Sequence, residues 1–167
     1  DGIKDGKEVN NGWNPLSSDT DGDGISDGDE VIVPANSFMS TAEVVSVVGG
    51  KVVFVDNYPD TYNIDCEKIE EAITERTKAI IAVHLYGQPA DMDKLLEICK
   101  KHNLYLIEDS ADTLGCKIKN RPTSIYSDIS ITSFYGSHII SCAGNGGMLC
   151  TNNIKYFTRA KILRSWG

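Results

Sequence analysis

Short apolar runs alternate with helix-like segments along most of this 167-residue chain, and this alternation constrains the fold more than any other feature. Runs rich in β-branched residues predict strands at 31–33, 51–55, 79–83, 104–107, 128–132 and 148–150. Apolar periodicity predicts helices between them, at 37–50, 65–73, 91–99 and 153–165. Helices of this length between strands favour βαβ units, so we predict an α/β fold with a mostly parallel sheet flanked by helices.

Polar side chains stand where three of these helices begin. Ser37 and Asp65 can each cap the helix that follows them, because a side-chain oxygen there accepts a hydrogen bond from the first turn. Asp91 starts the next helix in the same way. Gly49 and Gly50 follow the last periodic residue of the first helix, as is typical of a helix C-terminus.

The negative charge of the chain is concentrated at its N-terminus. The net charge is −8, and residues 1–30 supply −7 of it through nine acidic and two basic residues. The acidic balance argues against nucleic acid as the main partner, and no apolar run approaches the ~18 residues of a membrane span. The five cysteines are odd in number and lack paired spacing, which argues against a disulfide framework or a zinc site. We therefore predict two physically different segments, 1–30 and 31–167.

The acidic segment contains an internal repeat. Residues 1–9 match residues 23–31 at seven of nine positions. The second copy has calcium-loop spacing, with Gly24 at the sharp turn, and calcium prefers about six to eight oxygen ligands. The predicted ligands are Asp19, Asp21, Asp23, Ile25 through its carbonyl, Asp27 and Glu30. We expect Ca²⁺ binding here; the alternative is a solvated acidic linker without metal.

The spacer of the repeat carries a family resemblance. With Gly12, Asn14, Pro15 and Leu16, residues 1–31 resemble the thrombospondin type 3-like calcium repeats of bacterial surface proteins. No amphipathic helix precedes Asp19, so a paired EF-hand is not expected. Taken alone, this resemblance implies a cell-surface or secreted protein.

Chemistry-bearing residues follow several of the predicted strands. The carboxyl ends of parallel strands meet at one edge of a sheet, where binding sites form. The segments concerned are 34–41, 84–88, 108–112, 133–138 and 144–147. A carboxylate, a Ser, a His and a Gly-rich turn at that edge would suit a planar phosphorylated cofactor. Each signal has a structural alternative: Asp109 can cap a helix, and His84 is more often a packing residue than a base.

Several motifs together resemble one family. The motifs are Gly28–Pro34, Thr77–Ile81, Val83–Gln88, Ile107–Asp109, Ser133–Tyr135 and Gly144–Met148. Over residues 28–167 the chain is similar to the DegT-type sugar aminotransferases, which are enzymes of fold type I that use pyridoxal phosphate (PLP). The resemblance implies an incomplete large domain of that fold, preceded by the Asp/Gly-rich calcium-loop segment.

The resemblance also assigns roles to individual residues. Asp109 would contact the pyridine nitrogen of PLP, and Phe38 would stack on the ring face. Ser133 would hold a phosphate oxygen. Asp112 lies where the family has Gln or His beside the ring hydroxyl, and His138 replaces the lysine that joins the cofactor covalently.

Histidine at position 138 is similar to a dehydratase subgroup of the family. Imidazole cannot form the covalent link that lysine forms, so ordinary transamination is not expected. In that subgroup the aminated cofactor, PMP, reacts with a nucleotide-linked 4-keto-6-deoxyhexose, and the C3 hydroxyl leaves. His138 would be the catalytic base, since imidazole as a residue type suits proton removal of this kind. The segment Asp109–Gly115 is also similar to that subgroup; an aminotransferase-like activity is the nearer alternative.

Family members are much longer than this chain, act as homodimers and are cytoplasmic. We therefore expect the enzyme-derived domain to be truncated and weakened or inactive as it stands. The tripeptide Gly28–Glu30 belongs to both the calcium pattern and the enzyme pattern, which suggests a chimera. A second functional hypothesis is accordingly a calcium-binding module fused to a passive α/β scaffold, and a third is a non-functional chimera.

Overall fold

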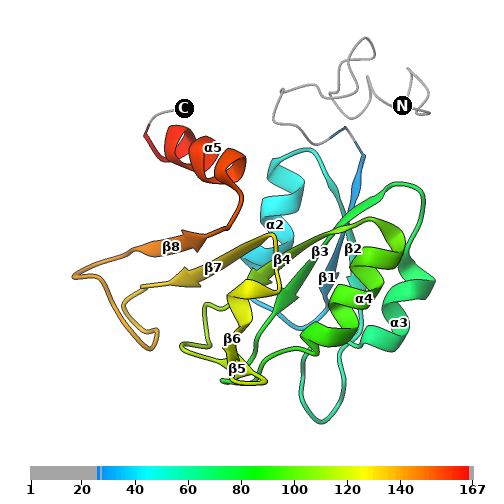
Figure 1. Ribbon diagram of the computed structural model, residues 1–167, viewed down its shortest axis with the longest axis horizontal. Helices are drawn as coiled ribbons and strands as arrows, with labels where there is room; N and C mark the ends of the chain where they lie inside the picture. The colour runs from blue at the N-terminus through cyan, green and yellow to red at the C-terminus, as the bar shows by residue number, and fades with distance from the viewer. Residues whose placement is uncertain (1–25, 27, 166–167) are drawn as a thin grey trace.

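A twisted six-stranded sheet forms the centre of the protein, as the computed structural model shows for residue 26 and residues 28–165 (Figure 1). Its strand order is β2-β1-β3-β4-β7-β8, in which all neighbours are parallel except β8, which is antiparallel to β7. The strands are β1 (Glu30–Pro34), β2 (Lys51–Val55), β3 (Thr77–Val83), β4 (Tyr105–Asp109), β7 (Ile129–Ser133) and β8 (Gly147–Cys150). The predicted α/β fold with a mostly parallel sheet is confirmed.

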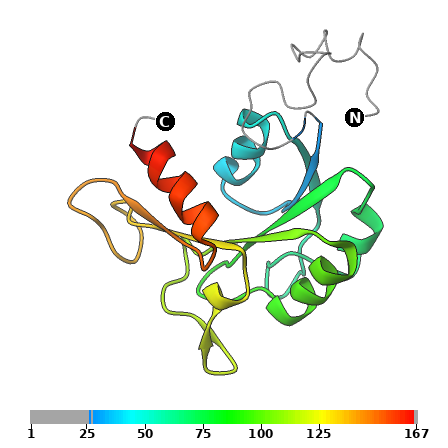
Figure 2. The same cartoon turned by 45° about the horizontal axis from the view of Figure 1, so that its top comes forward.

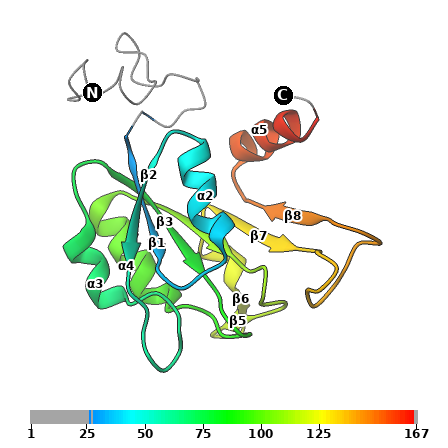
Figure 3. The ribbon, with the colours of Figure 1, turned by 180° about the vertical axis from the view of Figure 1, so that it is seen from behind.

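Four helices flank the sheet on both sides. They are α2 (Met39–Val47), α3 (Cys66–Ala72), α4 (Met92–His102) and α5 (Ile154–Arg164). Figures 2 and 3 show α3 and α4 together on one face, with α2 and α5 on the other. None of the described side chains of α5 is buried. Within the described part of the chain, no helix has the length and apolarity needed to cross a bilayer.

Two apolar clusters fill the spaces between sheet and helices. Ile32 and Ile80 pack with Leu95 of α4 on one face, whereas Val33 and Ile81 point to the other face, toward α2. Successive residues of a strand point to opposite faces, and both faces here are covered. This is why β1 and β3 are apolar at nearly every position.

Two of the three predicted helix starts are confirmed. Asp65 accepts a hydrogen bond from the backbone N–H of Glu67 at 3.0 Å, and Asp91 accepts one from that of Lys94 at 3.2 Å. The prediction for Ser37 is wrong. Helix α2 begins after Phe38 without a side-chain cap, because the Ser37 hydroxyl lies 2.8 Å from the Thr41 hydroxyl and is used there instead.

A small hairpin was not expected from the sequence. Strands β5 (Lys117–Ile118) and β6 (Arg121–Pro122) pair antiparallel, followed by a single 3-10 turn at Thr123–Ile125. The turn residues Lys119 and Asn120 both have positive φ, 50° and 63°, as a tight two-residue hairpin requires. Strands of two residues are too short to show an alternating pattern, which explains why this hairpin was missed.

Candidate functional site

Four neighbouring strands bring the predicted site residues to one edge of the sheet. Figure 1 shows these strands in the order β1-β3-β4-β7. Along the chain, Asp109 and Ser133 end β4 and β7, Phe38 follows β1, and His84, which was interpreted as a packing residue, follows β3. Hydrogen bonds tie the ends of β4 and β7 together: Ser110 N–H donates to Ile131 O at 2.9 Å, and the Thr132 hydroxyl donates to Ser110 O at 3.1 Å. The topology therefore places the loops after β4 and β7 side by side.

Asp109 ends β4 as a half-buried carboxylate. Its Oδ1 accepts a hydrogen bond from the backbone N–H of Ala111 at 3.0 Å, and its Oδ2 lies 3.5 Å from the donating hydroxyl of Thr41 in α2. Burial raises the pKa of Asp109, and the nearby charge of Asp112 adds to that rise. Among residues 28–165, no basic side chain forms an ion pair with Asp109, so its negative charge is poorly compensated. A cationic ring nitrogen would supply the missing charge.

His138 lies close to Asp112, a contact that the sequence did not predict. Its Nε2 is 3.8 Å from Asp112 Oδ1, and its ring meets the ring of Tyr135 edge-on, with centroids 5.5 Å apart. The backbone N–H of His138 donates to Tyr135 O at 2.9 Å, which closes a turn after β7. Nδ1 of His138 is buried and has no hydrogen-bond partner within the described residues. Of the two ring nitrogens, Nε2 therefore faces the Asp112 carboxylate and Nδ1 has no partner within the described residues.

Ser133 and Phe38 complete the set of predicted cofactor contacts. Ser133 is the last residue of β7, and its Oγ accepts a hydrogen bond from the backbone N–H of Tyr135 at 3.1 Å. That leaves the hydroxyl proton of Ser133 available to an acceptor such as a phosphate oxygen. Phe38 is 79% exposed and sits one helical turn before Thr41, the residue that contacts Asp109. Its ring is therefore accessible to a ligand at the start of α2.

Beneath this edge lies a buried polar network that the sequence analysis did not predict. Glu108 is fully buried and accepts hydrogen bonds from the hydroxyls of Ser110 (2.7 Å), Thr123 (2.6 Å) and Ser127 (3.2 Å). His84 Nε2 lies 3.3 Å from Glu108 Oε1. Burial alone would raise the pKa of Glu108, but the contacts with His84, Thr123 and Ser110 hold it below its ordinary value. A charged residue inside an apolar strand was the one signal that could have revealed this network.

The role of His84 is structural. Its side chain is completely buried, and its Nδ1 accepts a hydrogen bond from the backbone N–H of Ala90 at 3.1 Å. In the neutral ring this leaves the proton on Nε2, which lies 3.3 Å from Glu108 Oε1 but forms no hydrogen bond with it. Complete burial agrees with the interpretation of His84 as a packing residue, although its Nε2 has no hydrogen-bond partner within the described residues.

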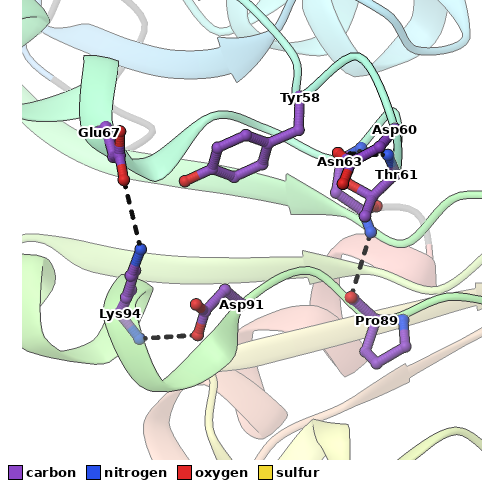
Figure 4. A pocket seen from close by; sticks show the side chains of 8 residues that line it. All are labelled: Tyr58, Asp60, Thr61, Asn63, Glu67, Pro89, Asp91 and Lys94. Carbon is purple, nitrogen blue, oxygen red and sulfur yellow. Dashed lines mark hydrogen bonds and ion pairs between the residues drawn. The ribbon is translucent and has the colours of Figure 1, made fainter.

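A separate hollow lies between the loops after β2 and β3. It has a volume of about 360 Å³ and is lined by Tyr58, Asp60, Thr61, Asn63, Glu67, Pro89, Asp91 and Lys94 (Figure 4). Asn63 is buried and joins the two loops: its Nδ2 donates to Pro89 O at 3.1 Å, and its Oδ1 accepts from Leu85 N–H at 3.2 Å. None of the predicted site residues lines this hollow.

Most of the predicted calcium loop falls outside the residues that the structure describes. Asp19, Asp21, Asp23, Ile25 and Asp27 belong to that part, and Glu30 alone can be placed. Glu30 is the buried first residue of β1, and both of its oxygens are engaged: Oε1 by Lys51 Nζ at 2.7 Å and Oε2 by the Thr74 hydroxyl at 2.6 Å. Residue 26 and residues 28–165 contain no cluster of three metal-ligating side chains.

Comparison with known proteins gives a consistent picture. The model of the DegT/DnrJ/EryC1/StrS aminotransferase family matches residues 6–167, and so runs across the predicted boundary at residue 30. A GDP-perosamine synthase from Caulobacter vibrioides is 42% identical over 166 residues, which are 99% of this chain and 44% of that protein. The chain thus spans less than half the length of this relative.

Solved structures agree with the sequence matches. The crystal structure of Streptomyces venezuelae DesV, in complex with a ketimine intermediate, has a TM-score of 0.82 at 37% identity, covering 86% of this chain and 39% of that one. The structure of NtdA from Bacillus subtilis with bound PMP has a TM-score of 0.73 at 41% identity, covering 78% of this chain and 29% of that one. The sheet described above is accordingly the one found in PLP enzymes of fold type I.

Proposed function

The chain belongs to the DegT/DnrJ/EryC1/StrS aminotransferase family, and we propose that it binds PLP or PMP at the sheet edge formed by Asp109, Ser133 and His138. The observation that carries this proposal is the half-buried carboxylate of Asp109 at this edge, which accepts two hydrogen bonds but has no basic ion-pair partner among residues 28–165, and whose pKa is raised by burial. A positive partner stabilises the charged form of a partly buried carboxylate, and a protonated pyridine nitrogen is such a partner. The PMP-bound relative supports the same cofactor.

The other site residues fit the remaining parts of the cofactor. Ser133 has a free hydroxyl proton for a phosphate oxygen, and the exposed ring of Phe38 offers an apolar face for stacking. Asp112 lies beside His138 and is suited to steer the imidazole as well as to neighbour the ring hydroxyl. When bound, the cofactor ring supplies an electron sink for bonds at the carbon attached to it. Asp109 maintains that capacity by keeping the ring nitrogen protonated.

We propose a nucleotide-linked sugar as the substrate, because the Caulobacter relative is named for a GDP-linked sugar. The finer proposal is C3 dehydration of a nucleotide-linked 4-keto-6-deoxyhexose, which rests on histidine at position 138. Asp112 faces Nε2 of His138 and favours a proton there, so the unpartnered Nδ1 is the atom able to accept another proton. The imidazolium that results is stabilised by the Asp112 carboxylate.

Aminotransferase-like chemistry is the alternative, since the family is named for that activity. It differs from the first proposal in needing an amine that can join the cofactor covalently, which imidazole is not. A His138→Lys variant tests the site geometry that both proposals require. If the site has fold type I geometry, this variant gains a new absorbance band with PLP and keeps the cofactor on dialysis. Wild type with PLP shows no such band and loses the cofactor.

The direct test of the dehydration proposal uses the intact chain with PMP and a nucleotide-linked 4-keto-6-deoxyhexose. Mass spectrometry follows the loss of one water molecule from the substrate, and the absorbance of the cofactor is recorded in parallel. His138→Asn is the matched variant, because its amide is similar in polarity but cannot accept the proton. Water loss that requires His138 supports the proposal; no water loss, or equal loss in both proteins, contradicts it.

Calcium binding by residues 19–30 is a second proposal, supported by the alternation of carboxylates at calcium-loop spacing. Glu30 would have to leave Lys51 and Thr74 to act as its final ligand. Calorimetric titration with Ca²⁺ tests it, with the Asp21→Ala, Asp23→Ala double variant as the comparison. Binding that is absent in wild type, or unchanged in the double variant, rules out this loop. On this proposal the chain comprises a calcium segment, 1–30, and an enzyme-derived segment, 31–167.

The family resemblance further leads us to propose a homodimer and a cytoplasmic location for the enzyme-derived part. Apolar side chains of α5, among them Ile154, Phe157 and Leu163, are exposed and would be covered by additional protein. Size-exclusion chromatography with light scattering measures the association state. A monomer at micromolar concentration would contradict the dimer proposal for this chain.

A further inference from the structure

Two consecutive carboxylates of β4 point in opposite directions and meet different surroundings. Asp109 is directed to the edge where the site residues gather, whereas Glu108 is directed into the interior and is fully buried. The proposed chemistry uses Asp109 and leaves Glu108 without a function. A buried, charged side chain needs several partners to be stable, so its surroundings are informative.

The partners of Glu108 come from three separate segments of the chain. His84 follows β3, Ser110 follows β4, and Thr123 and Ser127 lie in the segment that leads into β7. These are the same strands whose carboxyl ends carry the candidate site. One carboxylate therefore contacts three segments of the chain. The hydroxyls of Ser110, Thr123 and Ser127 donate hydrogen bonds to it, which restrict the movement of the segments after β4 and before β7. His84 Nε2 lies 3.3 Å away without a hydrogen bond.

The network continues from Glu108 to the site itself. Ser110 donates its hydroxyl to Glu108, while its backbone N–H and carbonyl bind the residues Ile131 and Thr132 of β7. His84 N–H donates to the carbonyl of Asp109 at 2.9 Å. Asp109 is thus held on both sides by residues that Glu108 holds in turn. The side chains that connect Glu108 to Asp109 are those of Ser110 and His84. Both are short, so the connection contains no long flexible side chain.

We propose that Glu108 is a positioning residue for the cofactor site: through Ser110 and His84 it fixes the orientation of the loop that carries Asp109 and Asp112. This inference rests on the proposed function, because the geometry that it fixes is that of Asp109 toward a ring nitrogen. It differs from a purely stabilising role in one measurable respect. Loss of the Glu108 charge alters the cofactor site, and not only the melting temperature.

The substitution Glu108→Gln tests the proposal, since glutamine has the same shape and retains neutral hydrogen bonds but no charge. We expect the variant to remain folded, to bind PMP about tenfold more weakly, and to show an altered ¹⁵N chemical shift of the PMP ring nitrogen. Thr123→Val, which removes the single 2.6 Å contact, is the milder second variant and decides the matter if Glu108→Gln does not fold. Circular dichroism establishes folding, and PMP fluorescence measures affinity.

Thr77→Val is the matched control. Thr77 is also buried, and its hydroxyl accepts a hydrogen bond from Thr74 N–H at 2.9 Å, but it lies at the opposite, amino end of β3. We expect this variant to lose stability without losing PMP affinity. An equal loss of affinity in Thr77→Val, or full affinity with an unchanged ring-nitrogen shift in the folded Glu108 or Thr123 variant, overturns the inference.

Asp109→Asn separates failure of this inference from failure of the proposed function. If PMP binds wild type and Asp109→Asn equally, or binds neither, the proposed cofactor site is wrong and the inference is overturned with it. If Asp109→Asn weakens binding and the Glu108 variant does not, only the positioning role is wrong. Weakened binding in both, with Thr77→Val unaffected, supports the positioning role.

Discussion

Glu30 lies where two accounts of the chain meet, as the predicted last calcium ligand and as the buried first residue of β1. Lys51 Nζ and the Thr74 hydroxyl donate to its two oxygens at 2.7 and 2.6 Å. Burial alone would raise the pKa of Glu30, but these two hydrogen bonds hold it below its ordinary value of 4.5. The substitution Glu30→Gln retains the shape of the side chain and removes its charge from both contacts.

The size of the effect follows from those contacts. A hydrogen bond to a charged group contributes about 1.5–3 kcal/mol, and a neutral one about 0.5–1.5 kcal/mol. The Lys51 side chain is 65% exposed, so water screens its contact and most of the loss arises at Thr74. We expect Glu30→Gln to lower the free energy of unfolding by about 1–2 kcal/mol. For a domain of this size that corresponds to a decrease of roughly 2–8 °C in Tm.

The assay is thermal unfolding at pH 7 and at a series of lower pH values. Because the folded-state pKa is depressed, the stabilisation is complete above pH 4.5 and is lost as the pH falls through the folded-state value. The difference between wild type and Glu30→Gln should therefore shrink in acid. Glu70→Gln, at an exposed carboxylate that pairs with Lys101 at 2.6 Å, is the control and should leave Tm unchanged. Equal Tm values for wild type and Glu30→Gln at pH 7, or a difference independent of pH, would refute the reasoning.

The same proteins distinguish the two accounts of Glu30. As an anchor of β1, Glu30 stabilises the fold whether or not Ca²⁺ is present, because Lys51 and Thr74 already saturate its oxygens. As a calcium ligand, it makes Tm depend on Ca²⁺ in wild type but not in Glu30→Gln. Melting curves with Ca²⁺ and with a chelator therefore show which role dominates.

Three further substitutions have expected outcomes. Asp109→Asn should raise Tm at pH 7, because burial raises the pKa of Asp109 and wild-type stability therefore falls as the pH rises above the ordinary value of 3.8. The gain in Tm should vanish below that pH, and a lower Tm at pH 7 would contradict the prediction. Leu95→Ala empties a fully buried position and should lower the unfolding free energy by about 3 kcal/mol, seen as a lower urea midpoint with unchanged m-value. Asn63→Ala should cost about 2 kcal/mol, because Leu85 N–H loses its acceptor; amide exchange at Leu85 should then accelerate, and unchanged protection would count against this.

Apolar pattern and turn chemistry predicted the main elements correctly. The run at 79–83 is buried on both faces as a central parallel strand, and the caps at Asp65 and Asp91 followed from residue type and position alone. The motifs also identified the family, which the match over residues 6–167 confirms, and so pointed to the loops after the strands as the place of the site. Helix caps and buried strands are predictable because they depend on residues close together in the sequence.

Features that depend on contacts between distant residues were not predictable. Ser37 has the residue type of a cap, but the Thr41 hydroxyl one turn later competes for it. Glu108 is visible in the sequence as a charged residue in an apolar strand, but its partners, His84 and Thr123 among them, are 24 and 15 positions away and could not be identified. Which of two adjacent carboxylates faces the site depends on strand register, and register is a property of the whole sheet.

Because of this register, insertions and deletions in β4 should disturb the structure more than substitutions do. Glu108 is paired with Ala82 on one side and Ser130 on the other, so the strand cannot slide to absorb an added or missing residue. With the start of the strand held in register, a single-residue deletion before Glu108 would move Asp109 to the interior position and Glu108 to the position of Ile107, on the opposite face. In a library of variants, substitutions within 105–107 should thus be recovered far more often than insertions or deletions there.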